Sequence, residues 1–186
     1  MGIGWAVIQP IFSMIVFTIV FGKLAKINSD GVPYAIFSYT ALVPWTYFSG
    51  ALTGASGSLL GASGMMTKVY FPRLIIPMAP VMSKLIDFGI AFVILLLMMA
   101  YFGFMPSIQI IYLPLLILIM MITASGMGMW LTAMAVQYRD INYAMSFFVQ
   151  LLMYAAPVVY PASIIPEPFR LIYGCFPMVG VIEGFR

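Results

Sequence analysis

Long apolar stretches separated by short polar segments run along almost the whole chain. A helix that crosses a membrane needs about 20 mostly apolar residues. Stretches near that length lie at about residues 4–22, 34–60, 82–102, 110–135 and 143–160. The pattern therefore predicts an all-α fold, a membrane helical bundle with about five transmembrane helices, in one domain over residues 1–186.

The segments between the predicted spans are polar or interrupted by proline. They lie at residues 23–33, 61–81, 103–109 and 136–142. We expect Pro72, Pro77 and Pro80 to interrupt any helix before the third span, because an interior proline lacks the N–H that a helix needs. The remainder, 164–185, is apolar but too interrupted for a clean span, which favours a re-entrant or interfacial helical segment.

Composition agrees with a bilayer as the solvent. The chain is 64% hydrophobic and 7% charged, whereas a soluble domain has about 25% charged residues. With no histidine and a single cysteine, Cys175, three-histidine zinc sites, histidine-based triads and an internal disulfide framework are excluded. The net charge of +3 is spread over several loops without a basic run, so we expect no nucleic-acid partner. Methionine-rich segments indicate adaptable packing, and no metal site is predicted.

The second predicted span is rich in small residues. Gly50 and Gly54, and again Gly57 and Gly61, have the four-residue spacing that lets helix backbones approach closely. A serine nucleophile at Ser56 or Ser63 is the alternative use of this stretch. Without histidine it would need a Ser–Lys dyad with Lys68 or Lys84, so close helix packing is strongly favoured.

Charged and aromatic residues near the predicted spans allow more than one interpretation. Lys84 and Asp87 lie three apart, on one helix face, which predicts a local ion pair at the membrane edge or, as the alternative, a gate or transmission contact. Arg139 and Asp140 are adjacent, so we expect them to reach separate partners. The many aromatic residues suit interface belts and packing, with stacking on sugar rings inside a channel as the alternative.

The loop between the second and third spans contains the stretch KVYFPR, with two cations, two aromatic rings and a proline in six residues. Its members are Lys68, Val69, Tyr70, Phe71, Pro72 and Arg73. Successive spans cross the membrane in opposite directions, so we expect this loop on the same side of the membrane as the loop 136–142. Basic residues are divided evenly between the two sides, so charge alone does not orient the chain.

Several stretches together resemble one family of membrane proteins. GIGWAVIQPIFSMIVFTIVFGKLA, PYAIFSYTALVPW, KVYFPRLIIP, YRDI and PMVGVIEGFR occur in one order, nearly end to end, as in the permease subunits of type-2 ABC exporters. The branch that it resembles most exports lipid-linked polysaccharides: O-antigen, capsule and teichoic-acid precursors. Ala62, Ala135, Gln137 and Phe176 stand where that family usually has other residues.

The resemblance implies a topology and a set of partners. Such permeases have six spans, an N-terminal interfacial helix and a re-entrant segment before the last span, so this chain would be a fragment that lacks the first helix and the last span. It would work as a homodimer in the bacterial inner membrane, contact membrane lipid and pass a lipid-linked glycan. ATP and magnesium would be bound by a separate ATP-binding subunit, with no cofactor in this chain.

The resemblance also assigns residues. It places a coupling helix in the cytoplasmic loop after the second span, so that Lys68 to Arg73 would dock the ATP-binding subunit, with a lipid-interface anchor as the alternative. Tyr138, Arg139 and Asp140 would form a second cytoplasmic loop that transmits its motion. The re-entrant segment would contain Pro177, Glu183 and Arg186.

Two other functions stay open. The same architecture could export a drug or another small hydrophobic molecule. An intramembrane glycosyl or acyl transferase would need catalytic acids in the membrane. The five acidic residues lie mostly in loops and far apart in sequence, which disfavours such an enzyme; they are Asp30, Asp87, Asp140, Glu167 and Glu183.

Overall fold

Helices account for most of the chain in a computed structural model, which describes residues 3–24, 32–66, 72–103, 108–138, 140–161 and 173–186. The helical elements are α1 (Ile3–Phe17), the π-helical η1 (Thr18–Leu24), α2 (Tyr34–Gly61), α3 (Ser63–Met66), α4 (Ile75–Tyr101), the 3-10 helix η2 (Ile108–Tyr112), α5 (Leu113–Gln137), α6 (Asp140–Ala155) and α8 (Pro177–Phe185). These ranges contain no strand. The predicted all-α membrane fold is confirmed.

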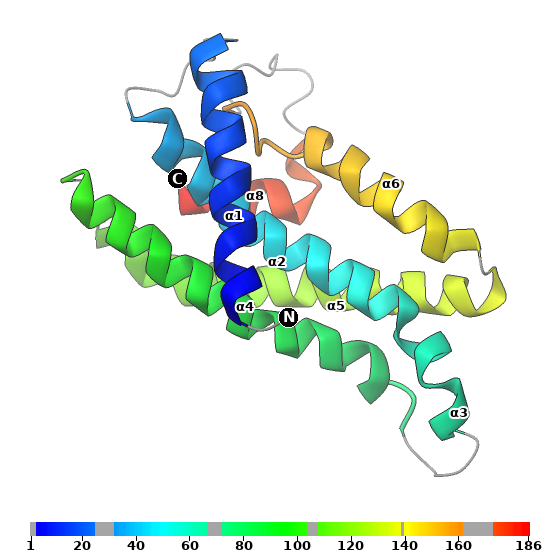
Figure 1. Ribbon diagram of the computed structural model, residues 1–186. Coiled ribbons are helices and arrows are strands. Elements are labelled where there is room, and N and C mark those ends of the chain that lie inside the picture. Colours follow the sequence, from blue (N-terminus) through cyan, green and yellow to red (C-terminus); the bar gives the residue numbers. More distant parts are fainter. Residues whose placement is uncertain (1–2, 25–31, 67–71, 104–107, 139, 162–172) are drawn as a thin grey trace.

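Helix α2 is the centre of the bundle. It contacts α1, α4, α5, α6 and α8, and it lies between them in Figure 1. Its buried tyrosines reach its neighbours: the Tyr39 hydroxyl donates to the Ala91 carbonyl over 3.4 Å and the Tyr47 hydroxyl to the Val81 carbonyl over 3.2 Å, both on α4. A buried hydroxyl needs such a partner, so these bonds fix how α2 is turned toward α4.

Small residues let α2 approach its other main neighbour, α5. A Cβ on Gly128 of α5 would lie only 3.0 Å from the Ala55 Cβ. At the same crossing Thr132 Oγ1 lies 2.8 Å from the Ala55 carbonyl oxygen. Helices in lipid associate through close packing and such interhelical hydrogen bonds, so this crossing stabilises the α2–α5 pair.

Three helical stretches of the described residues are long and apolar enough to cross a membrane: Val7–Leu24, Ile75–Tyr101 and Ile110–Gln137. Helix α2 has 28 residues but is less apolar, and α6 has 16 residues. Five crossings therefore stay a prediction.

Two of the three prolines before the third span, Pro77 and Pro80, do not interrupt a helix, so that expectation was wrong for them, whereas Pro72 lies before the helix begins. Helix α4 begins at Ile75 and includes Pro77 and Pro80. Pro77 lies in the first turn, where backbone N–H groups have no intrahelical partner, so its missing N–H costs nothing there. Pro80 lies in the next turn, inside α4, and its ring packs against Gly54 of α2.

The loop predicted over 136–142 is also shorter in the structure. Helix α5 continues to Gln137 and α6 begins at Asp140, with Tyr138 extended between them. An acidic residue in a first helical turn is favourable because it faces the positive end of the helix dipole. At the other end α6 stops at Ala155, five residues before the predicted end, because Pro157 disfavours a helical conformation at the residue before it.

The chain ends on a short helix that is packed into the bundle. Met178, Val179, Val181 and Ile182 of α8 are buried, and α8 contacts α5 and α2. Residues 162–172, which precede this helix, lie outside the described part of the chain, so the re-entrant segment stays a prediction.

Candidate functional site

Helix α6 has two chemically different faces. Met145 is buried, and Ile141, Phe148, Val149 and Leu152 pack around it against the core. Residues at these spacings share one side of a helix. The inward face is thus apolar and anchors α6 to the bundle, which leaves the opposite face exposed.

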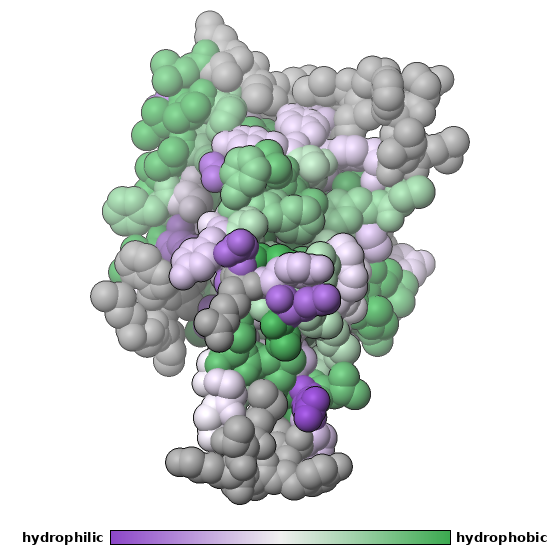
Figure 2. Space-filling view, turned by 90° about the vertical axis from the view of Figure 1, so that its right-hand side faces the viewer, coloured by the Kyte–Doolittle hydropathy of each residue, from purple (hydrophilic) through white to green (hydrophobic). Residues whose placement is uncertain are grey.

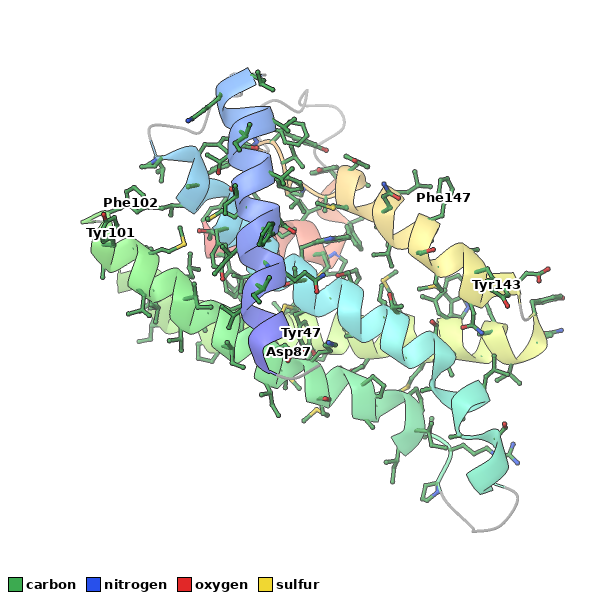
Figure 3. The ribbon with its side chains drawn as sticks, viewed as in Figure 1. Tyr47, Asp87, Tyr101, Phe102, Tyr143 and Phe147 are labelled. Atoms are coloured by element: carbon green, nitrogen blue, oxygen red, sulfur yellow. The ribbon has the colours of Figure 1, made fainter. Side chains whose placement is uncertain are left out.

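The exposed face of α6 mixes aromatic rings with polar groups. Tyr143 is 83% exposed and Phe147 is 65% exposed, and in Figure 3 both lie along the outer edge of α6. Ser146, Gln150 and Tyr154 are exposed at the helical spacings that continue this face. We call Tyr143, Ser146, Phe147, Gln150 and Tyr154 the α6 stripe.

The other long helices expose mainly aliphatic side chains. Helix α4 exposes Ile86, Val93 and Leu97, and α5 exposes Leu118 and Ile122, with one exposed aromatic ring each, Tyr101 and Trp130. Such aliphatic faces suit lipid tails. Polar side chains within membrane segments instead face the interior of a bundle or a water-filled cavity. The α6 stripe therefore has the composition of a surface that meets water or a polar ligand.

Polar residues gather at the end of the molecule where α5 passes into α6. Figure 2 faces this side and shows hydrophilic residues grouped in the middle of the view between hydrophobic areas. Gln137, Tyr138 and Asp140 are exposed there. Of the predicted second loop, Arg139 lies outside the described residues.

The predicted coupling loop is described only in part. Pro72 and Arg73 are exposed just before α4 begins. Lys68, Val69, Tyr70 and Phe71 lie outside the described residues. Helix α3 precedes this loop and extends from the end of α2 away from the other helices (Figure 1).

The four glycines of α2 have different neighbours. A Cβ on Gly54 would lie 2.8 Å from the Pro80 Cβ, and one on Gly50 would lie 3.2 Å from the Lys84 side chain, so both glycines lie at the α2–α4 contact. Gly57 faces Asn142 of α6, whose Oδ1 would be 3.9 Å from a new Cβ. A Cβ on Gly61 would meet nothing within 4 Å among the described residues.

Two ion pairs join residues three apart on their own helices. Lys84 Nζ lies 2.7 Å from Asp87 Oδ2, with both side chains a little over 40% exposed. Arg186 lies 3.1 Å from Glu183, and its own side chain is only 12% exposed. Each of these acidic groups is held by a cation, an arrangement that suits structural roles better than general acid or base catalysis.

Arg186 connects α8 to two other parts of the bundle. Its guanidinium donates to the carbonyl oxygens of Val158 and Tyr160 over 3.3 and 3.2 Å. It also lies over the Phe37 ring of α2, 3.8 Å from the ring centre. The sequence pattern gave no sign of these contacts, because they join residues up to about 150 positions apart. Pro177, the third predicted residue of this segment, begins α8.

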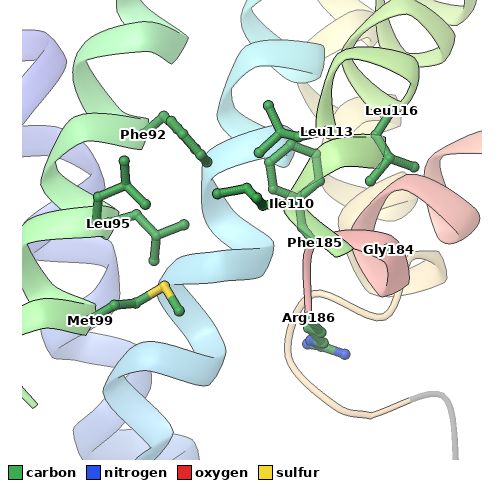
Figure 4. Close-up of a pocket in the computed structure, with 10 residues that line it drawn as sticks. Phe92, Leu95, Met99, Ile110, Leu113, Leu116, Gly184, Phe185 and Arg186 are labelled. Atoms are coloured by element: carbon green, nitrogen blue, oxygen red, sulfur yellow. The ribbon is translucent and has the colours of Figure 1, made fainter. Parts of the chain in front are cut away.

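An apolar cavity of about 120 Å³ lies between α4, α5 and α8. Phe92, Leu95 and Met99 line one side, Ile110 and Leu116 another, and Arg186 lies at its edge (Figure 4). Nothing in its lining except Arg186 carries a charge. The cavity lacks the convergent polar groups of a catalytic site.

The long apolar helices and their packing define a helical membrane protein. Comparison with known proteins then assigns the family. The chain belongs to the ABC-2 type transporter family, whose model matches residues 1–186. It is thus a transport subunit, and the resemblance to type-2 ABC exporter permeases is confirmed.

Curated relatives belong to the branch expected from the sequence. The O-antigen export system permease protein RfbA of Myxococcus xanthus is 26% identical over 188 residues, covering 100% of this chain and 72% of the relative. A protein of the same name from Klebsiella pneumoniae is 24% identical, covering 100% of this chain and 71% of the relative. A second Klebsiella pneumoniae protein of that name is 23% identical, over 98% of this chain and 70% of the relative.

Proposed function

We propose that this chain is the membrane-spanning subunit of an ATP-driven exporter that moves a lipid-linked polysaccharide outward across the bacterial inner membrane. Two copies would form the path, and a separate ATP-binding subunit would bind ATP and magnesium. The relatives named for O-antigen export support the substrate class. The structural observation that supports it best is the α6 stripe.

A polysaccharide path must satisfy hydroxyl groups and also let the chain slide. Aromatic rings offer flat, sequence-tolerant platforms, and the hydroxyl of a tyrosine adds a hydrogen-bonding edge. Ser146 and Gln150 supply further polar groups between the rings of the α6 stripe. A small hydrophobic cargo has no use for these polar groups, so the stripe favours the glycan over a drug-like molecule.

Removing a ring from the stripe tests this proposal. We expect Phe147→Ala and Tyr143→Ala to lower surface polysaccharide on the order of tenfold, taking the roughly 1–3 kcal/mol lost per aromatic platform in nucleic-acid channels as a guide. The measurement is surface glycan per unit of permease in the membrane. Phe12→Ala on α1 is the matched control, since Phe12 is also 65% exposed.

Equal export by Phe147→Ala, Phe12→Ala and wild type would contradict a role of the α6 stripe in the path. A purified complex whose ATPase activity responds to drugs and not to a lipid-linked glycan would instead favour the small-molecule exporter. Full export after Asp87→Asn and Glu183→Gln would argue against an intramembrane transferase, because it would show that the acids of α4 and α8 are not catalytic.

Docking of the ATP-binding subunit to the coupling loop is a separate prediction. We expect a Tyr70→Ala, Arg73→Ala double variant to lose most of the ATP-binding subunit in co-purification, because Tyr and Arg are frequent hot-spot residues at protein interfaces. Exposed Lys23, in η1, gives the control Lys23→Ala. Retention equal to that of the control would mean that KVYFPR is a lipid anchor or that the contact lies elsewhere.

A further inference from the structure

A second, polar cavity lies between α1, α2 and α4. Its volume is about 110 Å³, and its lining includes the polar residues Gln9, Thr46, Ser49, Lys84 and Asp87, with Tyr47, whose hydroxyl is bonded to Val81. Figure 3 shows Asp87 and Tyr47 beside the start of α1. A single buried water needs only roughly 10–15 Å³, so the cavity has room for a group of several atoms.

The cavity lies in an otherwise apolar part of the surface. Gln9 belongs to the stretch Val7–Leu24 and the ion pair to the stretch Ile75–Tyr101, both apolar enough to cross a membrane. Ile8 and Phe12 of α1 and Met82 and Ile86 of α4 are exposed on either side of these polar residues in the sequence. Lipid is therefore the natural neighbour of this cavity.

The ion pair leaves much of its hydrogen-bonding capacity unused. Lys84 Nζ has three N–H donors, and its one hydrogen bond within the described residues goes to Asp87 Oδ2. Asp87 Oδ1 accepts none there. Charged groups in an apolar setting are costly unless their remaining donors and acceptors are also satisfied. The pair thus calls for a partner that carries both a negative and a positive group.

The wall formed by α2 suits the positive group of such a partner. The Thr46 hydroxyl donates to the Val43 carbonyl and the Ser49 hydroxyl to the Thr46 carbonyl, over 3.0 and 3.2 Å. Both hydroxyl oxygens keep lone pairs that can accept hydrogen bonds. Gly50 lets the Lys84 stem lie against α2, since a Cβ there would be 3.2 Å from it.

We propose that this cavity binds the headgroup of a phospholipid with an ethanolamine group. The lipid phosphate accepts hydrogen bonds from the free N–H groups of Lys84, and the lipid ammonium donates to Asp87 and the α2 hydroxyls. Positive and negative groups then alternate around a closed ring with no net charge. A choline headgroup fits less well because its methylated nitrogen donates no hydrogen bond, and an anionic headgroup without an ammonium leaves Asp87 unmatched.

Lipid retention tests the proposal. The assembled permease is placed in nanodiscs of equal parts phosphatidylethanolamine, phosphatidylcholine and phosphatidylglycerol with identical acyl chains, then extracted in detergent, and the retained lipids are quantified by mass spectrometry. We expect wild type to retain phosphatidylethanolamine about tenfold better than phosphatidylcholine, which corresponds to about 1.4 kcal/mol. Lys84→Met and Asp87→Asn should each abolish this preference, whereas Lys23→Met should keep it.

Asp87→Asn preserves the shape of the side chain, so its effect separates the lost charge from a misfolded bundle, and its thermal unfolding temperature should stay close to that of wild type. Equal retention of the three lipids by wild type, or an unchanged preference in both variants, would overturn the proposal. A preference for phosphatidylglycerol that depends on Lys84 but not on Asp87 would also overturn it and indicate a simple anion site. None of these outcomes depends on which cargo the permease exports.

Discussion

Gly54→Leu is expected to lower the free energy of unfolding by about 1–3 kcal/mol, the range typical of overpacking a close contact. A Cβ at this position would lie 2.8 Å from the Pro80 Cβ. The proline ring is rigid and belongs to α4, so the strain is relieved only by moving α4 away from α2. Any gain from the better helix propensity of leucine, about 0.8 kcal/mol, is too small to offset this.

Gly61→Leu is the matched control, since it makes the same chemical change on the same helix where a Cβ would meet nothing within 4 Å. We expect it to be neutral or slightly stabilising. Denaturant titration in detergent micelles, followed by the change in helical circular dichroism, measures both variants. If Gly54→Leu and Gly61→Leu unfold alike, the α2–α4 contact is looser than the structure shows.

Arg186→Ala should have an effect of similar size, about 3 kcal/mol. The guanidinium bonds Glu183 and the carbonyls of Val158 and Tyr160, and it covers the Phe37 ring. Hydrogen bonds of a charged group contribute about 1.5–3 kcal/mol, and a cation–π contact adds about 0.5–2 kcal/mol. Its loss leaves the carbonyls of Val158 and Tyr160 and the Glu183 carboxylate without this partner, so α8 should detach from α2 before the bundle unfolds.

Arg186→Lys distinguishes charge from geometry. Lysine keeps the charge but lacks the planar fork of donors, so we expect a loss intermediate between wild type and Arg186→Ala. Amide hydrogen exchange of residues 178–185 reports on α8 directly and should rise first in Arg186→Ala. If exchange in α8 matches that of wild type, the buried residues Met178, Val181 and Ile182 hold the helix in place without the contacts of Arg186.

Hydrophobic pattern alone predicted the helical membrane class and most of the long helices. The errors fell at helix ends, where proline rules were applied without knowing the neighbouring helix. Pro80 stays inside α4 and packs against Gly54 of α2. Asp140 joins α6 as its first residue, and Pro157 ends the helix early.

The sequence predicted the candidate site only where its residues lie close together along the chain. The spacing of Lys84 and Asp87 predicted a pair, and the structure has that pair at 2.7 Å. The α6 stripe also has a regular spacing in the sequence. Its exposure could not be known, because any side of a helix can face lipid, protein or water. Gln9 lines the same cavity as this ion pair because α1 packs beside α2 and α4. No sequence pattern links Gln9 to Lys84.

By itself the sequence determined that the chain is a helical membrane protein, which apolar stretches form its helices, and which residues share a helix face. These properties depend on composition and on the short period of the helix. Tertiary structure alone decided that α2, although less apolar than α1, α4 and α5, is the central helix, and that Arg186 meets Phe37. Hydropathy reports how apolar a helix is, but lipid and protein interior are similarly apolar, so only packing decides which of them surrounds it.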